Sequence, residues 1–382
     1  MIDPKDAPCK GLKVIEFATM VSGPFAGQML CDLGAEVIKI EPATGDPMRA
    51  MHPKQNDLPA FFQQINRNKK SVALDLKEKE GRATALELCR EADVVVENFR
   101  PGVMKRLGLG YETLAAANPG LVFASITGFG PDGPYVDRPA YDHVVQGLCG
   151  VMDDFGQYSE DKAPVPVRNF LVDKVASTTL AQGVLAALLA RERNGGKGQT
   201  VSVSLLEAYA ALMLPAIMIN HTFQNDGAER IRKIDMYHPI RTTDGFVIGH
   251  IQTDSQFEGM CRTAGREDLI ADARFKDAWS RMLNYETMWS EMEVGTSKQD
   301  IATVIVNAAK YSVPLAPVNS ITDFFDDPQV QYNKTWFDIE DADYGTIRNL
   351  CYPVRFGSSQ IKIEKRAPRF REHQYDILKD DG

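Results

Sequence analysis

Residues 12–40 decide the fold, because Leu12-Lys-Val-Ile-Glu-Phe17 and Gly34-Ala-Glu-Val-Ile-Lys-Ile40 flank a helical segment at residues 24–33. Both outer segments have the alternating, β-branched pattern of strands, and Pro24 suits the first turn of the helix between them. The pattern therefore predicts a β-α-β unit.

The same alternation continues along the chain. Asp93-Val-Val-Val-Glu97 is apolar through its centre, as in a parallel sheet that helices cover on both faces. We therefore expect an α/β fold with a doubly wound, largely parallel sheet. The other expected strands are residues 72–76, 121–126 and 199–204, and the expected helices are residues 80–91, a short one from 101, and 111–117.

The second half of the chain has a different pattern. Residues 205–219 form a long apolar helix, and a polar linker follows. A strand at residues 245–251 and charged amphipathic helices between residues 255 and 310 indicate a second, smaller α+β domain. Residues 336–339 and 345–356 are typical of a hairpin.

Composition excludes several classes of protein. A net charge of −9 over 382 residues opposes binding to nucleic acid or to an anionic membrane. The longest apolar run, residues 203–219, contains Glu207 and Pro215 and is short for a membrane span. The six cysteines and six histidines form no metal-ligand pair, so we expect no metal and a cytoplasmic protein with reduced thiols.

One motif is misleading. Gly128-Phe-Gly130-Pro-Asp-Gly133 has the glycine spacing of a dinucleotide-binding loop and follows a strand. That loop must open a helix, whereas Pro134 and Pro139 bracket an irregular segment here. A tight turn is the better interpretation. The chain also lacks a Gly-x-Ser-x-Gly elbow and a P-loop, which leaves carboxylate chemistry.

Residues 175–190 are almost wholly small and apolar, so a helix here has no polar face and is expected to be buried. Asp173 stands at its start, where unpaired backbone N–H groups and the helix dipole favour an ionised carboxylate. Such a group is either a helix cap or a nucleophile, and the local sequence leaves both roles open.

Several segments together resemble the class III coenzyme A-transferases, or CaiB/BaiF proteins, which include formyl-CoA and carnitine CoA-transferases and 2-methylacyl-CoA racemases. The matching segments occur in order along the first half of the chain. They are Gly11-Leu-Lys-Val-Ile-Glu-Phe17, Ser22-Gly-Pro24, Leu33-Gly-Ala-Glu-Val-Ile-Lys-Ile-Glu41, Asn66-Arg-Asn-Lys-Lys-Ser-Val-Ala-Leu-Asp-Leu-Lys77, Val96-Glu-Asn-Phe-Arg-Pro-Gly102, Thr127-Gly-Phe-Gly130, Val172-Asp173 and Arg193-x-x-Gly-x-Gly-Gln-x-Val-x-Val203.

The resemblance implies an enzyme that moves CoA from an acyl-CoA donor to a small carboxylic acid. Asp173 matches the family nucleophile, which forms an aspartyl anhydride and then an aspartyl-CoA thioester. CoA is a substrate, and no cofactor is tightly bound. The implied substrate and oxyanion region is Val21, Ser22, Gly23, Tyr141 and Asp142. The implied CoA-binding residues are Leu74, Asp75, Leu76, Lys77, Asn98, Phe99, Arg100, Arg106, Arg138 and Tyr141.

The resemblance further implies a homodimer whose subunits interlock. The expected organisation is then a large CoA-binding domain at residues 1–204, a linker helix at 205–235, a small domain at 236–325, and a return segment at 326–382 that completes the large domain.

Departures from the family pattern keep alternatives open. Racemases have a His–Asp pair where Tyr141-Asp142 stand, and His143 on a helix is expected to point elsewhere. Val21 replaces the glutamine of formyl-CoA transferases, and the arginine they have near the position of Pro42 is missing. Residues 235–243, where the family has a closing glycine loop, contain no glycine. A racemase-like enzyme and a non-catalytic CoA-binding protein remain the other readings.

Two residues of that segment bear on the acceptor. Arg241 and His238 are expected near the mouth of the site, which would suit a dicarboxylic acid.

Overall fold

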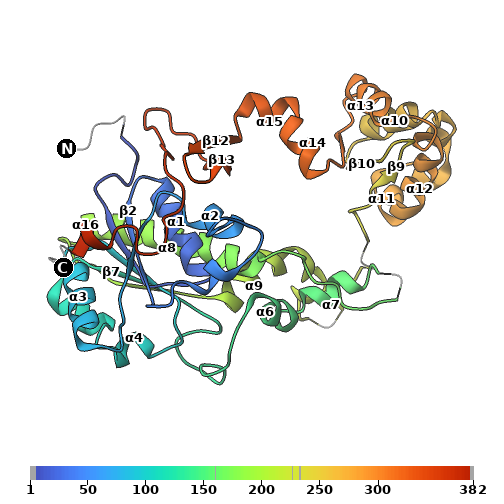
Figure 1. Ribbon diagram of the computed structural model, residues 1–382. Coiled ribbons are helices and arrows are strands. Elements are labelled where there is room, and N and C mark those ends of the chain that lie inside the picture. The colour runs from blue at the N-terminus through green and yellow to red at the C-terminus, as the bar shows by residue number, and fades with distance from the viewer. Residues whose placement is uncertain (1–5, 160, 226, 232–233, 379–382) are drawn as a thin grey trace. The chain divides into compact units, whose positions relative to one another are not determined.

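The computed structural model describes residues 6–159, 161–225, 227–231 and 234–378 (Figure 1). The chain forms two compact units. One takes in the described residues up to Ile219 and from Lys334 onward, and the other those from Asn220 to Asn333. The sequence predicted domain boundaries after residues 204, 235 and 325. The first unit extends beyond residue 204 to Ile219, because the helix that follows residue 204 packs on this unit.

A six-stranded sheet is the centre of the first unit. Its strand order is β5-β2-β1-β6-β7-β8, and every neighbouring pair is parallel. The chain therefore winds outward from β1 in one direction and then from β6 in the other, which confirms the doubly wound fold. The strands are β1 (Lys13–Glu16), β2 (Glu36–Glu41), β5 (Lys70–Ala73), β6 (Val94–Glu97), β7 (Val122–Thr127) and β8 (Thr200–Ser204).

Both faces of the sheet are buried. Successive side chains of a strand point to opposite faces, so Val14 and Val94 join the core on one face while Ile15 and Val95 join the core on the other. Helices from separate parts of the chain cover each face. They are α1 (Ser22–Asp32), α8 (Leu171–Arg193) and α9 (Leu205–Ile217) on the first, and α3 (Lys79–Arg90), α4 (Val103–Arg106) and α5 (Tyr111–Ala117) on the second.

Helix α8 is less buried than its composition predicted. Leu180 and Val184 are fully buried against the sheet, but Leu185 and Leu189 are 37% and 52% exposed. A helix of uniformly small and apolar residues does not specify which side meets the core. The expectation of a helix buried all round is therefore wrong for the single chain.

The C-terminal segment returns to the first unit and covers the edge of its sheet. The His373 N–H donates to the Ser71 carbonyl, and the Gln374 side chain bonds both the N–H and the carbonyl of Ala73. An uncovered edge strand would present unpaired backbone groups, so this segment completes strand β5. It comprises the hairpin β12 (Trp336–Asp341) and β13 (Gly345–Leu350), which confirms the predicted hairpin, and α16 (Gln374–Leu378).

The second unit has its own core. Three short antiparallel strands in the order β11-β10-β9 pack with helices around Met260 and Trp289. No helix among the described residues is long and apolar enough to cross a membrane. The elements of this unit are β9 (Ile240–Arg241), β10 (Phe246–Gly249), β11 (Leu315–Pro317), α10 (Asp254–Ala264), α11 (Ala278–Leu283), α12 (Tyr285–Thr296), α13 (Ile301–Lys310), α14 (Ile321–Asp326) and α15 (Pro328–Asn333).

A cluster of charged side chains is fully buried between the sheet and α1. The Glu16 carboxylate lies 3.0 Å from Lys39 Nζ and 2.8 Å from Lys69 Nζ, and Lys39 also lies 2.9 Å from Asp46. Two cations thus balance two anions away from water. Burial alone would lower the pKa of Lys39, but the surrounding carboxylates raise it above its usual value.

The buried cluster leaves no room for a side chain at Gly27. A Cβ atom there would lie 2.0 Å from Glu16 Oε2. We predict that Gly27→Ala destabilises the protein by about 2–4 kcal/mol, because it displaces a buried carboxylate from its cations. Gly147→Ala is the matched control in α6 (Asp142–Leu148), since its nearest neighbour would be Met152 Sδ at 3.7 Å. It should be neutral or stabilising by up to about 1 kcal/mol in urea unfolding. Equal losses of unfolding free energy in Gly27→Ala and Gly147→Ala would contradict the prediction.

Candidate active site

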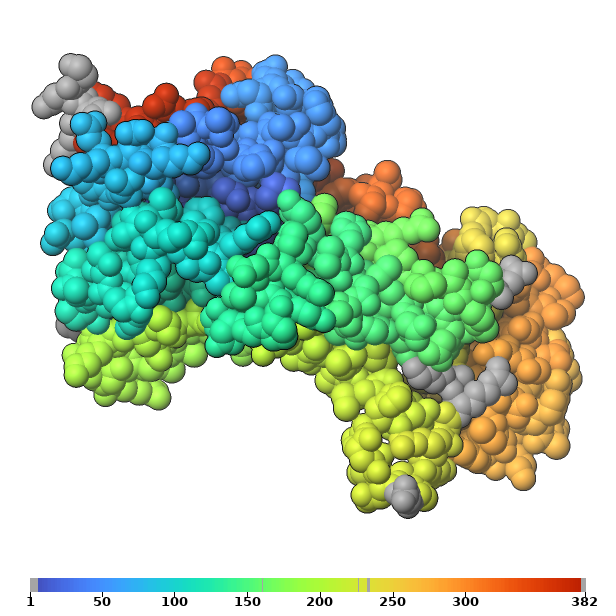
Figure 2. Space-filling model, turned by 90° about the horizontal axis from the view of Figure 1, so that it is seen from below, coloured from blue at the N-terminus to red at the C-terminus, as the bar shows by residue number. Residues whose placement is uncertain are grey.

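A cavity of about 550 Å³ lies in the first unit. Loops that follow β1, β6 and β7 line it, together with the first residues of α6 and α8. Ligands of open α/β sheets bind outside the carboxyl ends of the strands where the winding direction reverses, which here is between β1 and β6. The segments that follow β6 and β7, coloured from cyan to green, form much of the face of this unit seen in Figure 2.

Asn98 holds the loop after β1 in place. Its Oδ1 accepts the Thr19 N–H at 2.9 Å, and its Nδ2 donates to the Thr19 carbonyl at 2.8 Å and to Ser22 Oγ at 3.2 Å. The loop leads into α1, whose second residue is Gly23, and a Cβ at Gly23 would lie 2.2 Å from the Cβ of Ala18. This close approach requires glycine.

The residue that caps α8 is Asp142. Its Oδ2 accepts the N–H groups of Val172 at 2.7 Å and Asp173 at 3.2 Å, while its Oδ1 accepts from Gln146 Nε2 at 2.6 Å. The Asp142 side chain is buried and reaches α8 from the first residue of α6. An unpaired helix terminus is thus satisfied from outside the helix. The alternative role for Asp173, a helix cap, is therefore already filled.

Asp173 is the third residue of α8 and lines the cavity. No described residue forms a hydrogen bond or ion pair with its carboxylate. Burial, and after it the negative charge of Asp142, raises the pKa of Asp173 to about 7. The sequence predicted a carboxylate kept charged by the helix dipole. The structure differs, because desolvation and a nearby like charge outweigh that dipole.

Ser177 links α8 to the start of α1. Its Oγ lies 2.6 Å from the Ser22 carbonyl oxygen and 2.6 Å from the Asp173 carbonyl oxygen, and its single proton can be donated to one of them at a time. The contact is fully buried. It fixes the helix that carries Asp173 relative to the loop on the other side of the cavity.

The structure brings most of the predicted site residues to one place and leaves others outside. Those outside the cavity lining are Gly23, the segment 74–77 and Arg106. Segment 74–77 directly follows β5, so it lies at the carboxyl end of the parallel strands, as the cavity does. The predicted residues that line the cavity are Val21, Ser22, Asn98, Phe99, Arg100, Arg138, Tyr141, Asp142 and Asp173.

His143 departs from its expected position. The helix pattern predicted that it points away, but it lines the same cavity as Asp173. Its ring packs edge-on against Phe170, with centroids 6.3 Å apart. The prediction failed because α6 begins only at Asp142, so the first turn faces the cavity mouth.

The sequence also gave no role to Glu97. This buried carboxyl accepts the Phe99 N–H at 2.8 Å and shapes the turn after β6. Burial raises the pKa of Glu97 to about 7, while that hydrogen bond opposes the increase.

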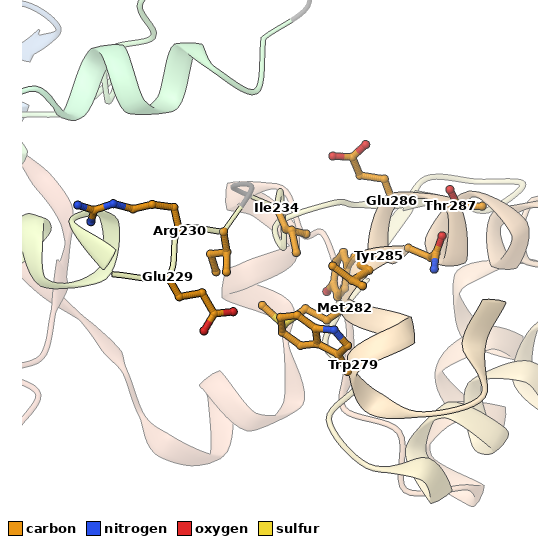
Figure 3. Close-up of a pocket in the computed structure, with 11 residues that line it drawn as sticks. Glu229, Arg230, Ile234, Trp279, Met282, Tyr285, Glu286 and Thr287 are labelled. Carbon is orange, nitrogen blue, oxygen red and sulfur yellow. The ribbon is translucent and has the colours of Figure 1, made fainter. Parts of the chain in front are cut away.

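A second cavity, of about 430 Å³, lies in the second unit (Figure 3). Trp279, Met282 and Tyr285 are grouped on one wall, with Glu229 and Arg230 on the chain segment opposite. None of the predicted site residues lines it, and residues 235–243 also belong to this unit. Among the described residues, no group of three or more His, Cys, Asp or Glu side chains is placed to hold a metal ion.

Comparison with known proteins identifies the family. The model for CoA-transferase family III matches residues 9–374. The chain belongs to this family. The transferase is 34% identical over 385 residues to a succinate–glutarate CoA-transferase of Agrobacterium fabrum, covering 97% of this chain and 95% of that one. It is 37% identical over 331 residues to an acetyl-CoA:oxalate CoA-transferase of Acetobacter aceti, covering 84% and 83%.

A solved structure gives the same result. A CaiB/BaiF family protein from Brucella suis superposes with a TM-score of 0.86 at 33% identity, covering 98% of the transferase and 100% of that protein. The resemblance found in the sequence is confirmed, and the transferase is an enzyme of class III.

The link through Ser177 can be tested by removing its hydroxyl group. We predict that Ser177→Ala lowers the free energy of unfolding of the transferase by about 1 kcal/mol, because a buried hydrogen bond between α8 and α1 is lost. Thr178→Ala is the control: Thr178 makes the same bond within the helix, to Lys174, but is exposed. It should change stability by less than about 0.5 kcal/mol. Urea unfolding of both variants measures the difference, and equal effects would show that the link contributes nothing.

The raised pKa of Asp173 has a consequence for stability. A carboxyl whose pKa is higher in the folded state binds more protons there, so stability falls as pH rises from about 4 to 7. Asp173→Asn avoids this loss. We predict that it is more stable than the wild type at pH 8 by an amount on the order of 1–3 kcal/mol, and that the gain shrinks toward pH 4.

Thermal or urea unfolding at several pH values measures this gain, with Asp132→Asn on an exposed segment as the control. A pH-independent difference would refute the assigned pKa.

Proposed function

We propose that the enzyme transfers CoA from an acyl-CoA donor to a carboxylic acid through covalent intermediates on Asp173. The observation that carries this proposal is the division of roles between two neighbouring carboxylates. Asp142 uses its oxygens to cap α8, whereas the Asp173 carboxylate forms no hydrogen bond with any residue that the structure describes and lines the cavity. A carboxylate held at an electrophile without competing partners is suited to nucleophilic catalysis.

The first half of the reaction loads CoA onto the enzyme. An oxygen of Asp173 attacks the thioester carbonyl of the donor, the C–S bond breaks, and an acyl-aspartyl anhydride and a CoA thiolate form. The thiolate then attacks the aspartyl carbonyl carbon. The donor leaves as a free carboxylate, and an aspartyl-CoA thioester remains on residue 173.

The second half repeats these steps with the acceptor. Its carboxylate attacks the aspartyl thioester, which releases the thiolate and forms a second anhydride. The thiolate attacks the acceptor's acyl carbon, gives the new acyl-CoA and frees Asp173. One anion replaces another at each step, so no net proton is transferred and no resident cofactor is needed. The resting enzyme must only have Asp173 ionised.

Backbone groups at the start of α1 suit the developing oxyanions. Within the described chain, the N–H groups of Val21, Ser22 and Gly23 make no hydrogen bond, and Pro24 has no N–H. Val21 and Ser22 line the cavity with Asp173. Preorganised N–H donors beside a reacting carbonyl are an effective way to stabilise a tetrahedral oxyanion.

Cationic side chains support CoA binding. Arg100 and Arg138 line the cavity, and the Arg138 guanidinium lies 3.8 Å from the ring centroid of Tyr135. Neither arginine has an acidic partner among the described residues. Lys77 follows β5 and Arg106 follows β6, so both lie beyond the carboxyl ends of the parallel strands. Their positive charges suit the phosphates of CoA.

The acceptor is proposed to be a small dicarboxylic acid. The relatives described above are named for succinate, glutarate and oxalate, all of which carry two carboxylates. These relatives are transferases, and Tyr141 stands where the racemases have a histidine. Both facts favour transfer over racemisation.

We also propose a homodimer. Leu185 and Leu189 of α8 and Leu212 of α9 are exposed, together with Ile219 just beyond it. Apolar side chains exposed along two packed helices are typical of an interface with another chain.

The covalent role of Asp173 can be tested by trapping it. The enzyme is incubated with succinyl-CoA or acetyl-CoA and then with hydroxylamine, and the peptide containing residue 173 is examined by mass spectrometry. We expect a hydroxamate on Asp173 in the wild type and none in Asp173→Asn. That variant should retain CoA binding and lose turnover by a factor on the order of 10³ or more.

The pH dependence gives a second measure. Because only the ionised carboxylate is nucleophilic, kcat/KM should fall as pH decreases below about 7. An adduct on another residue, or full activity in Asp173→Asn, would overturn the proposal.

A further inference from the structure

The mouth of the cavity carries an imidazole that neither the capping of α8 nor the proposed chemistry uses. His143 is the second residue of α6 and is exposed on the cavity side. Its ring packs edge-on against Phe170, which in turn stacks on Phe61 with centroids 5.5 Å apart. Phe170 directly precedes α8, so this stack fixes the imidazole relative to the helix that carries Asp173.

His143 is also available to bind a ligand. Its ring nitrogens make no hydrogen bond or ion pair with any residue that the structure describes. The nearest carboxylate in sequence, Asp142, is committed to Val172, Asp173 and Gln146. An imidazole supplies an N–H donor when neutral and two when charged.

A dicarboxylic acceptor needs such a group. One of its carboxylates must reach the aspartyl thioester on residue 173, and the other is then carried into the same cavity. Met20, Val21 and Phe170 give that cavity an apolar lining, where an anion without a donor is costly. Arg100 and Arg138 match CoA-binding positions of the family, and His143 is the remaining basic side chain among the described residues that line the cavity.

We propose that His143 binds the distal carboxylate of the acceptor and thereby selects dicarboxylic over monocarboxylic acids. This proposal rests on the function proposed above. His143 is a specificity residue in this role, because it touches the acceptor far from the bonds that form and break. Its loss should affect acceptors with a second carboxylate and spare those without one.

The experiment compares paired acceptors with the purified full-length enzyme and succinyl-CoA as donor. The acceptors are the C2–C6 dicarboxylate that the wild type uses best and the monocarboxylate of the same carbon number. In His143→Phe, we expect kcat/KM for the dicarboxylate to fall at least tenfold and that for the monocarboxylate to change less than twofold. His143→Gln, which keeps an N–H donor, should recover part of the loss.

Two further variants separate the contributions. Tyr141→Phe tests the neighbouring hydroxyl group, since Tyr141 also lines the cavity and is 69% exposed. His221→Phe makes the same replacement at an exposed histidine that does not line the cavity and should leave both acceptors unchanged. Discrimination lost in Tyr141→Phe but kept in His143→Phe would transfer the role to Tyr141 and overturn the proposal.

The remaining outcomes are also decisive. If His143→Phe lowers kcat/KM equally for both acceptors, or for neither, His143 does not bind the second carboxylate. The proposal for His143 would also be overturned if the wild-type enzyme used no dicarboxylate as acceptor. Hydroxylamine trapping distinguishes failure of this proposal from failure of the proposed function. A hydroxamate on Asp173 in both wild type and His143→Phe keeps the covalent mechanism, whereas its absence from the wild type rejects it.

Discussion

The site depends on one interaction, the hydrogen bonds from the first N–H groups of α8 to the carboxylate of Asp142. A helix end needs an acceptor, and an aspartate within the helix itself would be a natural choice. Because Asp142 supplies the acceptor from another helix, the Asp173 carboxylate is not needed to cap α8. Its carboxylate can then line the cavity, where burial and, after it, the negative charge of Asp142 raise its pKa. One carboxylate thus holds the start of the helix that carries the other, and it adds to the effect of burial on the pKa of Asp173.

The opposite wall of the cavity is held with comparable rigidity. Lys39 Nζ donates to the Ala18 carbonyl at 2.8 Å, and Asp46 accepts the Met20 N–H at 3.2 Å, so the buried charge cluster reaches the loop after β1 directly. Asn98 fixes the residue between these two. Buried ion pairs are weak evidence for stability, since desolvation cancels much of their attraction. Here they hold backbone N–H groups at fixed positions, which is what stabilising an oxyanion requires.

The sequence predicted the fold well where local pattern carries the information. Alternation along residues 12–17 and 93–97 specifies strands with two buried faces, and Pro24 and Asp173 mark two helix starts. The buried cluster could not be predicted, because Glu16, Lys39 and Lys69 pair across 23 and 53 residues of chain. From the local sequence alone, each of these charged side chains would be expected to face water. Only the folded structure shows that their charges neutralise one another.

The same limit applies within the site. Resemblance pointed to Asp173 from the sequence, but the partner that caps α8 lies 31 residues earlier, and no local pattern joins them. His143 was misplaced for a related reason. Helical periodicity gives relative directions within a helix, and it becomes a direction in space only once the start of α6 at Asp142 is known.

Stability and chemistry make opposite demands at Asp173. A folded protein is most stable when a buried carboxylate is paired or neutral, whereas above neutral pH Asp173 is ionised and has no cationic partner in the described part of the chain. Pairing it with a cation would lower its pKa and make it a weaker nucleophile that is easier to keep ionised. Each step of anion exchange replaces a carboxylate by a thiolate or another carboxylate at nearly constant charge. In the proposed mechanism, a site that accommodates the buried Asp173 carboxylate in the resting enzyme would meet the same electrostatic demand at each later anion, so the unfavourable burial of Asp173 would serve every step of the reaction.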